Sequence, residues 1–187
     1  MWAKHLYNWD YEVFKSIHVG WSHPWLNPLF IVFTWLGRGE LQGALILLGL
    51  MHPLGKKLFW PLAVSFGAGG LIGAQVIKHL VPRDRPSQLP ISHPLEHIFY
   101  NSFPSGHTTS TAAIAMLLTW ALWGKKSFWL AYAAWIATAL AGLSRIYLGV
   151  HWPTDVIAGI FSGSLFGTLT FFAFPSLRKN QRLSEFK

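Results

Sequence analysis

Long apolar runs separated by short polar segments dominate the chain. Four of them, residues 59–81, 106–123, 128–148 and 154–174, have the roughly 17–25 residues that a transmembrane helix needs. Charged side chains enter these runs only near their ends, at Lys78, Arg145 and Asp155. The pattern therefore predicts an all-α, integral-membrane helical bundle.

A fifth apolar stretch, residues 26–54, is interrupted in its middle by Gly37, Arg38, Gly39 and Glu40. It is either one helix of about 28 residues with a charged centre facing the bundle, or two short helices joined at these residues. We favour one helix, because each half is too short to cross about 30 Å of hydrocarbon alone. The bundle then has five transmembrane helices, or six under the second interpretation.

The two ends of the chain differ from the apolar runs. Within the N-terminal segment 1–24, residues 6–18 have helical spacing of apolar side chains, with Asp10, Glu12 and Lys15 mostly off that face. We expect an amphipathic helix lying in the membrane interface. Residues 175–187 form a C-terminal segment whose polar end, from Arg178, is expected to be a mobile cytoplasmic tail.

Composition supports a single membrane domain covering residues 1–187. Hydrophobic residues make up 52% of the chain and charged residues 12%, which is too apolar for an ordinary soluble domain. The net charge of +8 lies in short clusters between apolar runs, where anionic lipid is a better partner than nucleic acid. The chain has no cysteine, which excludes disulfides and thiolate chemistry, and nothing in the sequence fixes an oligomeric state.

The positive charges also predict an orientation. In a five-helix chain, the loop after residue 54, the loop after residue 123 and the C-terminal segment share one side of the membrane. These places hold more than half of the fifteen Lys and Arg residues against a single acid, Glu185. The positive-inside rule makes that side cytoplasmic. The N-terminus, the 82–105 loop and the turn between residues 148 and 154 then face outwards.

Small residues recur at every fourth position in two of the runs, at Gly69 and Gly73 and at Gly159, Gly163 and Gly167. Such stripes let helix backbones approach closely in lipid, so we expect them to serve packing.

Three clusters of polar residues lie at helix ends on the predicted outer side. They are K-x6-R-P (Lys78, Arg85, Pro86), P-S-G-H (Pro104, Ser105, Gly106, His107) and S-R-x5-H-x3-D (Ser144, Arg145, His151, Asp155). A single cation at a helix end usually extends to lipid headgroups. Three cations together with two histidines and a carboxylate indicate a reactive site instead.

The second and third clusters suggest roles. Ser105 has the side chain of an N-cap and Gly106 leaves the first backbone N–H groups open, which is an anion-binding arrangement with His107 beside it as a proton donor. Asp155, four residues after His151, could orient that imidazole as a nucleophile. The alternative for this third cluster is a structural role, in which Asp155 caps a helix and His151 is an interfacial histidine that already has its hydrogen-bond partners.

The three motifs resemble those of the type-2 phosphatidic acid phosphatase family of integral-membrane lipid phosphatases. The resemblance covers about residues 65–170 and implies a phosphohistidine formed on His151, supported by Asp155, with His107 protonating the leaving oxygen. It also implies that Lys78, Arg85, Ser105, Gly106 and Arg145 hold the phosphate, and that neither a metal nor another cofactor takes part. Residues 26–37 resemble the family's weaker first-helix pattern, and the 82–105 loop carries no family motif between Pro86 and Pro104.

The substrate stays open, as do three competing interpretations of the site: a phosphotransferase, a zinc site and a non-catalytic binding protein. Within the family, undecaprenyl diphosphate, phosphatidylglycerophosphate, phosphatidic acid and lipid A phosphates are all candidates; we rank the first highest, for a site facing outwards from a bacterial inner membrane. A phosphotransferase would use the same residues. His93, Glu96 and His97 spell the zinc-binding pattern H-x-x-E-H, but in a proline-containing loop without an evident third ligand. A protein that binds lipid phosphate without cleaving it would not need an oriented nucleophile.

Overall fold

The computed structural model describes residues 2–51, 56–96 and 101–182, and these parts of the chain are helical, with no strand. The N-terminal half contains α1 (Trp2–His18), α2 (Asn27–Trp35), α3 (Gly39–Met51), α4 (Lys56–Ser65), the π-helix η1 (Phe66–Gly73), α5 (Ala74–Leu80) and the 3-10 turn η2 (Pro86–Gln88). The C-terminal half contains α6 (Gly106–Leu122), the 3-10 turn η3 (Lys126–Phe128), α7 (Trp129–Tyr147), α8 (Pro153–Ala173) and α9 (Pro175–Arg182).

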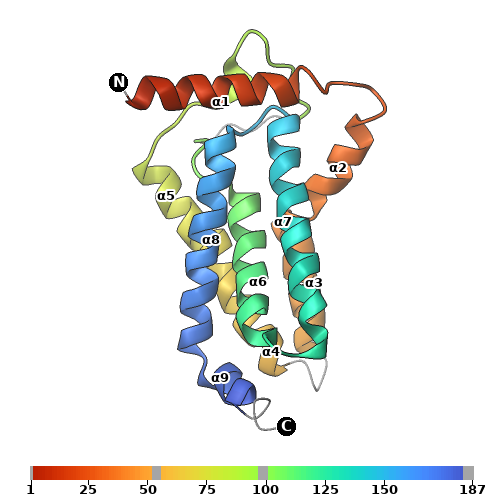
Figure 1. Ribbon diagram of the computed structural model, residues 1–187, viewed down its shortest axis with the longest axis vertical. Helices are drawn as coiled ribbons and strands as arrows, with labels where there is room; N and C mark the ends of the chain where they lie inside the picture. The colour runs from red at the N-terminus through yellow and green to blue at the C-terminus, as the bar shows by residue number, and fades with distance from the viewer. Residues whose placement is uncertain (1, 52–55, 97–100, 183–187) are drawn as a thin grey trace.

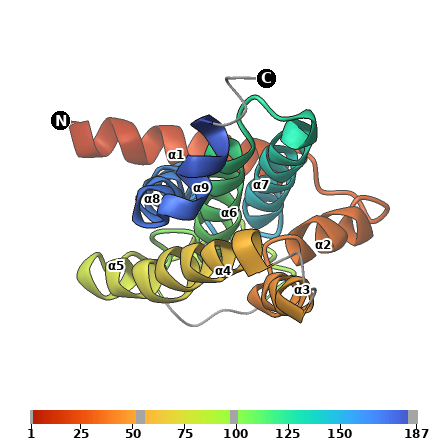
Figure 2. The same cartoon turned by 90° about the horizontal axis from the view of Figure 1, so that it is seen from below.

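Helix α6 is the centre of the bundle. It packs most extensively against α8, then against α7 and η1, and Figure 2 shows it surrounded by these elements. The glycine stripe of α8 faces it: a Cβ added at Gly159 would lie 2.9 Å from Ser105 O, and one at Gly167 would lie 2.5 Å from Ala113 O. The prediction that this stripe serves close backbone packing is confirmed.

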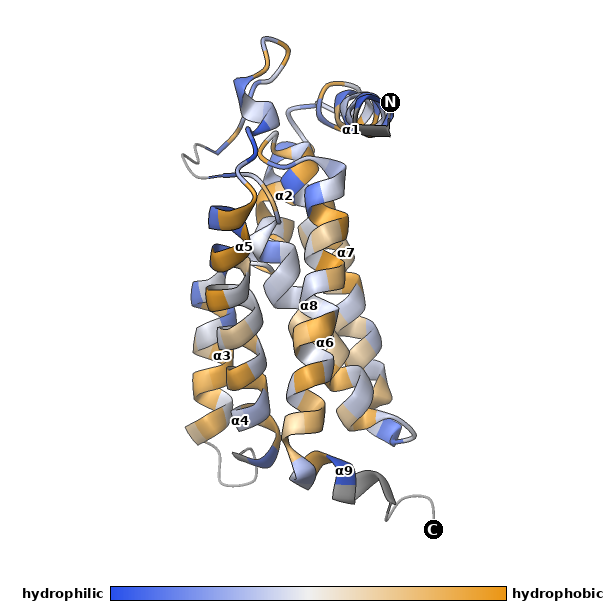
Figure 3. Ribbon diagram, turned by 90° about the vertical axis from the view of Figure 1, so that its left-hand side faces the viewer, coloured by the Kyte–Doolittle hydropathy of each residue, from blue (hydrophilic) through white to orange (hydrophobic). Residues whose placement is uncertain are grey.

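The outside of the bundle is apolar along its length, and polar residues gather at its two ends (Figure 3). Three helical stretches, Lys57–Leu80, Lys126–Tyr147 and Pro153–Ala173, are long and apolar enough to cross a membrane, and α2 with α3 forms a fourth if the bent pair counts as one span. Helix α6 has 17 residues, about 25 Å at 1.5 Å per residue. The expected count of five transmembrane helices therefore stays a prediction.

Residues 26–51, the described part of the fifth apolar stretch, do not form the continuous helix that we favoured. The chain turns at Leu36 and Gly37, and α2 and α3 meet at an angle of 44°. A Cβ added at Gly37 would lie 2.7 Å from the Cβ of His107, so this glycine lets the bend pass against α6. The bend interrupts the helix, and it brings Gly37 into close contact with α6 at the centre of the bundle.

Helix α1 lies across one end of the bundle (Figure 1), and it buries Phe14 of the expected apolar face together with Asp10 of the expected polar side. Asp10, Phe14 and His18, spaced four residues apart, are buried against the bundle, whereas Leu6 and Trp9 from the expected apolar face are 55% and 46% exposed. The helical spacing predicts Asp10 on the polar side of this helix, and a lone carboxylate is costly to bury. Its buried position is possible because it has partners in two other segments.

The C-terminal segment also differs from the expectation. The chain is helical as far as Arg182 in α9, at the opposite end of the molecule from α1 (Figure 1), rather than a mobile tail from Arg178. Leu177 is buried in a cluster with Leu117 and Phe171. Leu177 therefore packs α9 against the bundle.

Candidate active site

The residues of the three sequence motifs lie at the end of the bundle that α1 covers. Lys78 is in the last turn of α5, Arg85 precedes η2, Ser105 to His107 begin α6, Arg145 is in the last turn of α7, His151 follows α7, and Asp155 is in the first turn of α8. Six of them, Lys78, Arg85, Ser105, Arg145, His151 and Asp155, are buried at 7% exposure or less. The fold thus gathers these residues from segments that are far apart in the sequence.

His151 has a defined tautomer. Its Nε2 receives a hydrogen bond from Arg85 Nη1 at 3.2 Å, and because a guanidinium can only donate, Nε2 carries a lone pair. Its Nδ1–H therefore donates to Asp155 Oδ2, at 3.3 Å. Burial lowers the pKa of His151 to about 3, against the opposing effect of the Asp155 carboxylate. The imidazole is neutral at physiological pH and presents Nε2 as a nucleophile.

Asp155 is held by several donors besides His151. Ser102 Oγ and the backbone N–H of Trp152 both donate to Oδ2, the latter at 2.9 Å. Arg83 Nη1 donates to Oδ1 at 2.7 Å. These contacts fix the carboxylate that orients the imidazole, which is the usual function of such outer partners.

Arg83 connects this carboxylate to α1. Its Nη2 donates to Asp10 Oδ2 at 2.5 Å, so one guanidinium bridges Asp155 and Asp10. Asp10 also accepts hydrogen bonds from the backbone N–H and the hydroxyl of Thr154, at 2.9 and 2.5 Å. Sequence reasoning missed Arg83, Asp10 and Ser102; the spacing of Asp10 with Phe14 and His18 was the one available signal.

Arg145 is fully buried and incompletely satisfied. Its Nη1 donates to Thr34 Oγ1 at 2.5 Å and to Glu96 Oε2 at 2.8 Å. Its Nε and Nη2 have no hydrogen-bond partner among the residues that the structure describes. A buried donor without a partner is unfavourable, so this arrangement is suited to an incoming anion with several oxygens.

The start of α6 leaves space for such an anion. A Cβ added at Gly106 would meet no atom within 4 Å, so the glycine is not required by packing within the chain. Ser105 is the N-cap residue, but its side chain makes no capping hydrogen bond; its Oγ accepts one from Thr108 at 3.0 Å. Lys78 Nζ donates to the backbone oxygen of Asn101 at 2.9 Å, which places the ammonium beside the segment that leads into α6.

His107 lies between these groups and the α2–α3 bend. The charged groups of Arg145, Arg38 and Lys78 lie close enough to act on its ring. Gly37 contacts the same side chain from the bend, because a Cβ there would also lie 2.8 Å from His107 Cδ2. The position of the His107 imidazole therefore depends on a residue outside the three motifs.

We expect Gly37→Ala to lower kcat by about 10- to 100-fold, since misplacing a catalytic group by about 1 Å can cost on the order of 100-fold. The matched control is Gly43→Ala in α3, where a Cβ would have only Phe66 Cε1 at 3.9 Å, an ordinary contact. Phosphate release by the two purified variants checks this expectation. Equal activity of both would show that the contact at Gly37 does not position His107.

The described residues of the H-x-x-E-H pattern, His93 to Glu96, are not surrounded as zinc ligands would be. Glu96 pairs with Arg145 and, at 3.8 Å, with Arg38, and the backbone N–H of His93 donates to His18 Nε2 at 3.0 Å. His97 lies outside the described residues. Within the parts of the chain that are described, no three His, Asp or Glu side chains come together as metal ligands would.

Comparison with known proteins agrees with this arrangement. Residues 58–179 match the model of the PAP2 superfamily. The bacitracin transport permease protein BcrC of Bacillus licheniformis is 43% identical over 171 residues, covering 89% of this chain and 81% of that protein. An undecaprenyl-diphosphatase of Sulfolobus acidocaldarius is 32% identical over 161 residues, covering 82% and 72%.

A solved structure gives the same result at the level of the fold. The crystal structure of a transmembrane PAP2-type phosphatidylglycerolphosphate phosphatase from Bacillus subtilis aligns with a TM-score of 0.76 at 27% identity, covering 89% of this chain and 84% of that one. Motifs, fold and sequence similarity therefore agree, and the chain belongs to the PAP2 superfamily.

Proposed function

We propose that the protein is a lipid phosphatase that hydrolyses a lipid phosphate or diphosphate through a phosphohistidine on His151. The observation that carries the proposal is the combination of an oriented, neutral imidazole with a buried arginine, two of whose nitrogens have no hydrogen-bond partner in the described parts of the chain. Binding alone would need the arginine but not the oriented imidazole. The names of relatives as phosphatases support the same reaction class.

The reaction follows from the positions of the groups. His151 Nε2 attacks phosphorus, the bond from phosphorus to the leaving oxygen breaks, and His107 donates a proton to that oxygen. Arg145, Arg85, Lys78 and the N–H groups at the start of α6 stabilise charge on the other phosphate oxygens. Water then attacks the phosphohistidine, its proton returns to His107, and inorganic phosphate leaves with His151 restored.

Because these cations supply the charge that Mg²⁺ provides in other phosphoryl-transfer enzymes, we expect phosphate release to continue in excess EDTA. Vanadate, which adopts the five-coordinate geometry of the transferring phosphorus, should inhibit. The measurement is phosphate release by purified protein before and after chelation. Loss of activity in EDTA with recovery on adding Zn²⁺ would instead support the zinc interpretation of His93 to His97.

Among the possible substrates, undecaprenyl diphosphate ranks first. One relative is named as an undecaprenyl-diphosphatase, another as a putative one, and others as phosphatidylglycerophosphatase B and lipid A 1-phosphatase. Assaying phosphate release from undecaprenyl diphosphate, phosphatidylglycerophosphate, phosphatidic acid and a lipid A phosphate separates these candidates. A higher kcat/KM for any of the other three would overturn the ranking.

The site is proposed to face outwards from a bacterial cytoplasmic membrane, because the cationic segments lie at the other end of the bundle. The chain has no native cysteine, so single cysteines can report orientation. We expect Gln88→Cys, near the site, to react with a membrane-impermeant maleimide in intact cells, and Ser176→Cys in α9 to react only after lysis. Both residues are exposed, so accessibility of the side chain does not bias the comparison. The reverse labelling pattern would show that the site faces the cytoplasm.

A further inference from the structure

Arg38 is a charged residue that the proposed reaction does not use. It lies at the α2–α3 bend, between two apolar helices, where a charge is unfavourable unless it has a function. Its guanidinium carbon is 5.2 Å from the centre of the Trp35 ring, and its Nη2 is 3.8 Å from Glu96 Oε1. The side chain is 45% exposed, and a guanidinium has five donors, so these two contacts leave capacity for a ligand.

The position of Arg38 relative to His107 indicates what that ligand is. In phosphoryl transfer the attacking and leaving groups lie on opposite sides of phosphorus, roughly in line. With His151 as the nucleophile and His107 protonating the leaving oxygen, the leaving group extends past His107. Gly37, the residue next to Arg38, contacts His107, and the charge of Arg38 acts on both His107 and Arg145. The bend is thus where the leaving group is held.

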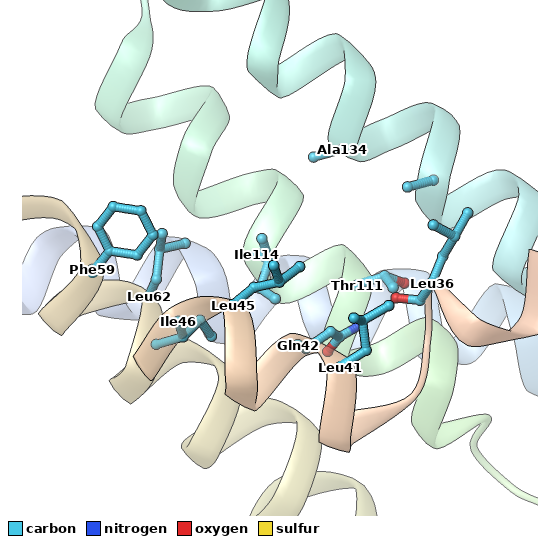
Figure 4. Close-up of a pocket in the computed structure, with 11 residues that line it drawn as sticks. Leu36, Leu41, Gln42, Leu45, Ile46, Phe59, Leu62, Thr111, Ile114 and Ala134 are labelled. Atoms are coloured by element: carbon cyan, nitrogen blue, oxygen red, sulfur yellow. The ribbon is translucent and has the colours of Figure 1, made fainter. Parts of the chain in front are cut away.

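An apolar groove begins at the same bend. It has a volume of about 280 Å³ and lies between α3, α4, α6 and α7, with the side chains pointing into it (Figure 4). Leu36 and Leu41, on either side of the bend, line it, as does Thr111, whose hydroxyl donates to the backbone oxygen of His107 at 3.0 Å. An apolar groove that begins beside this bend is suited to the hydrocarbon chain of the substrate. The atoms between chain and leaving oxygen then pass Arg38.

We propose that Arg38 binds the phosphate next to the hydrocarbon chain in a lipid diphosphate, while the terminal phosphate reacts at His151. This inference rests on the proposed function and narrows it to diphosphates. His107 then protonates the bridging oxygen, and the lipid monophosphate leaves while the Arg38 guanidinium stabilises its negative charge. A lipid monophosphate has no second phosphate, so the guanidinium has no corresponding group to bind.

The test compares farnesyl diphosphate with farnesyl monophosphate, which share one hydrocarbon chain, as substrates of the purified protein. Because hydrogen bonds between charged groups are among the strongest in proteins, we expect Arg38→Gln to lower kcat/KM at least tenfold more for the diphosphate than for the monophosphate. Arg38→Lys should fall between Arg38→Gln and the wild type on the diphosphate. Lys15→Gln, which removes an exposed cation from α1 at the same end, should leave the ratio unchanged.

The outcomes separate this inference from the proposed function. Equal losses on the two substrates, or no loss on either, would overturn the role of Arg38. Hydrolysis of the monophosphate alone by the wild type would overturn it too, and would leave the proposed phosphatase reaction standing. Absence of phosphate release by the wild type from both substrates and from the four lipids above would overturn the proposed function itself.

Discussion

His151→Ala should abolish turnover, with a loss of kcat on the order of 10³-fold or more, as is found when a nucleophile is deleted. The substitution removes the atom to which phosphorus is transferred, so every later step is lost as well. The phosphoenzyme that forms with a ³²P-labelled substrate should disappear together with phosphate release. Both measurements are needed, because a residue that only positions the substrate could lower turnover without preventing the covalent intermediate.

The matched control is His79→Ala. His79 is an exposed histidine of α5 whose Nδ1 hydrogen-bonds only within its own helix, to Gln75 O at 2.8 Å. Its variant should keep wild-type kcat and the labelled intermediate. Retention of the labelled intermediate in His151→Ala would assign the nucleophile to another residue.

His107→Ala should have a large effect that depends on the substrate. Loss of a proton donor costs roughly 10²- to 10⁴-fold when the leaving group is a poor one, as the alkoxide of a lipid monophosphate is. An aryl phosphate has a leaving group that departs without a proton. We therefore expect the His107 variant to recover much of its rate on p-nitrophenyl phosphate, and the His151 variant to recover none.

This comparison has an internal control, because the same two substrates are used with both variants and a general folding defect would affect them equally. Asp155→Asn, which changes the orientation of the nucleophile but leaves the proton donor, should slow both substrates. Rescue of His151→Ala by the aryl phosphate, without rescue of His107→Ala, would exchange the two proposed roles.

The sequence predicted the helical class and that the three motifs would gather at one end of the bundle, because each motif is local and sits at the end of an apolar run. Lys78, Arg145 and Asp155 could be assigned to one side of the membrane by counting helices. Their burial and their contacts could not be predicted in this way, since these depend on helix packing. Whether the eight motif residues to which a role is assigned have that role is for variants such as those above to test.

Most of what the sequence did not predict involves partners far apart in the chain. Asp10 and Arg83 are separated by 73 positions, and Arg145 and Glu96 by 49. Neither pair belongs to a local pattern. The first joins α1 to the loop after α5, and the second joins the same loop to α7. The α2–α3 bend was missed for a related reason. The length of the apolar stretch favoured one helix, and the packing of Gly37 against His107 of α6 can be seen only in the folded bundle.

The attachment of α1 to the site through Asp10 sets the order in which the active end can be completed during synthesis. Asp10 leaves the ribosome early, whereas Thr154, to which it is hydrogen-bonded, follows 144 residues later. At about 5–20 residues per second, roughly 7–30 s separate the two. During that interval Thr154, whose backbone N–H donates to Asp10, and Asp155, the other carboxylate that Arg83 binds, have not been synthesised. The contacts that join α1 to the candidate site are therefore incomplete until the last long apolar helix, α8, has been made.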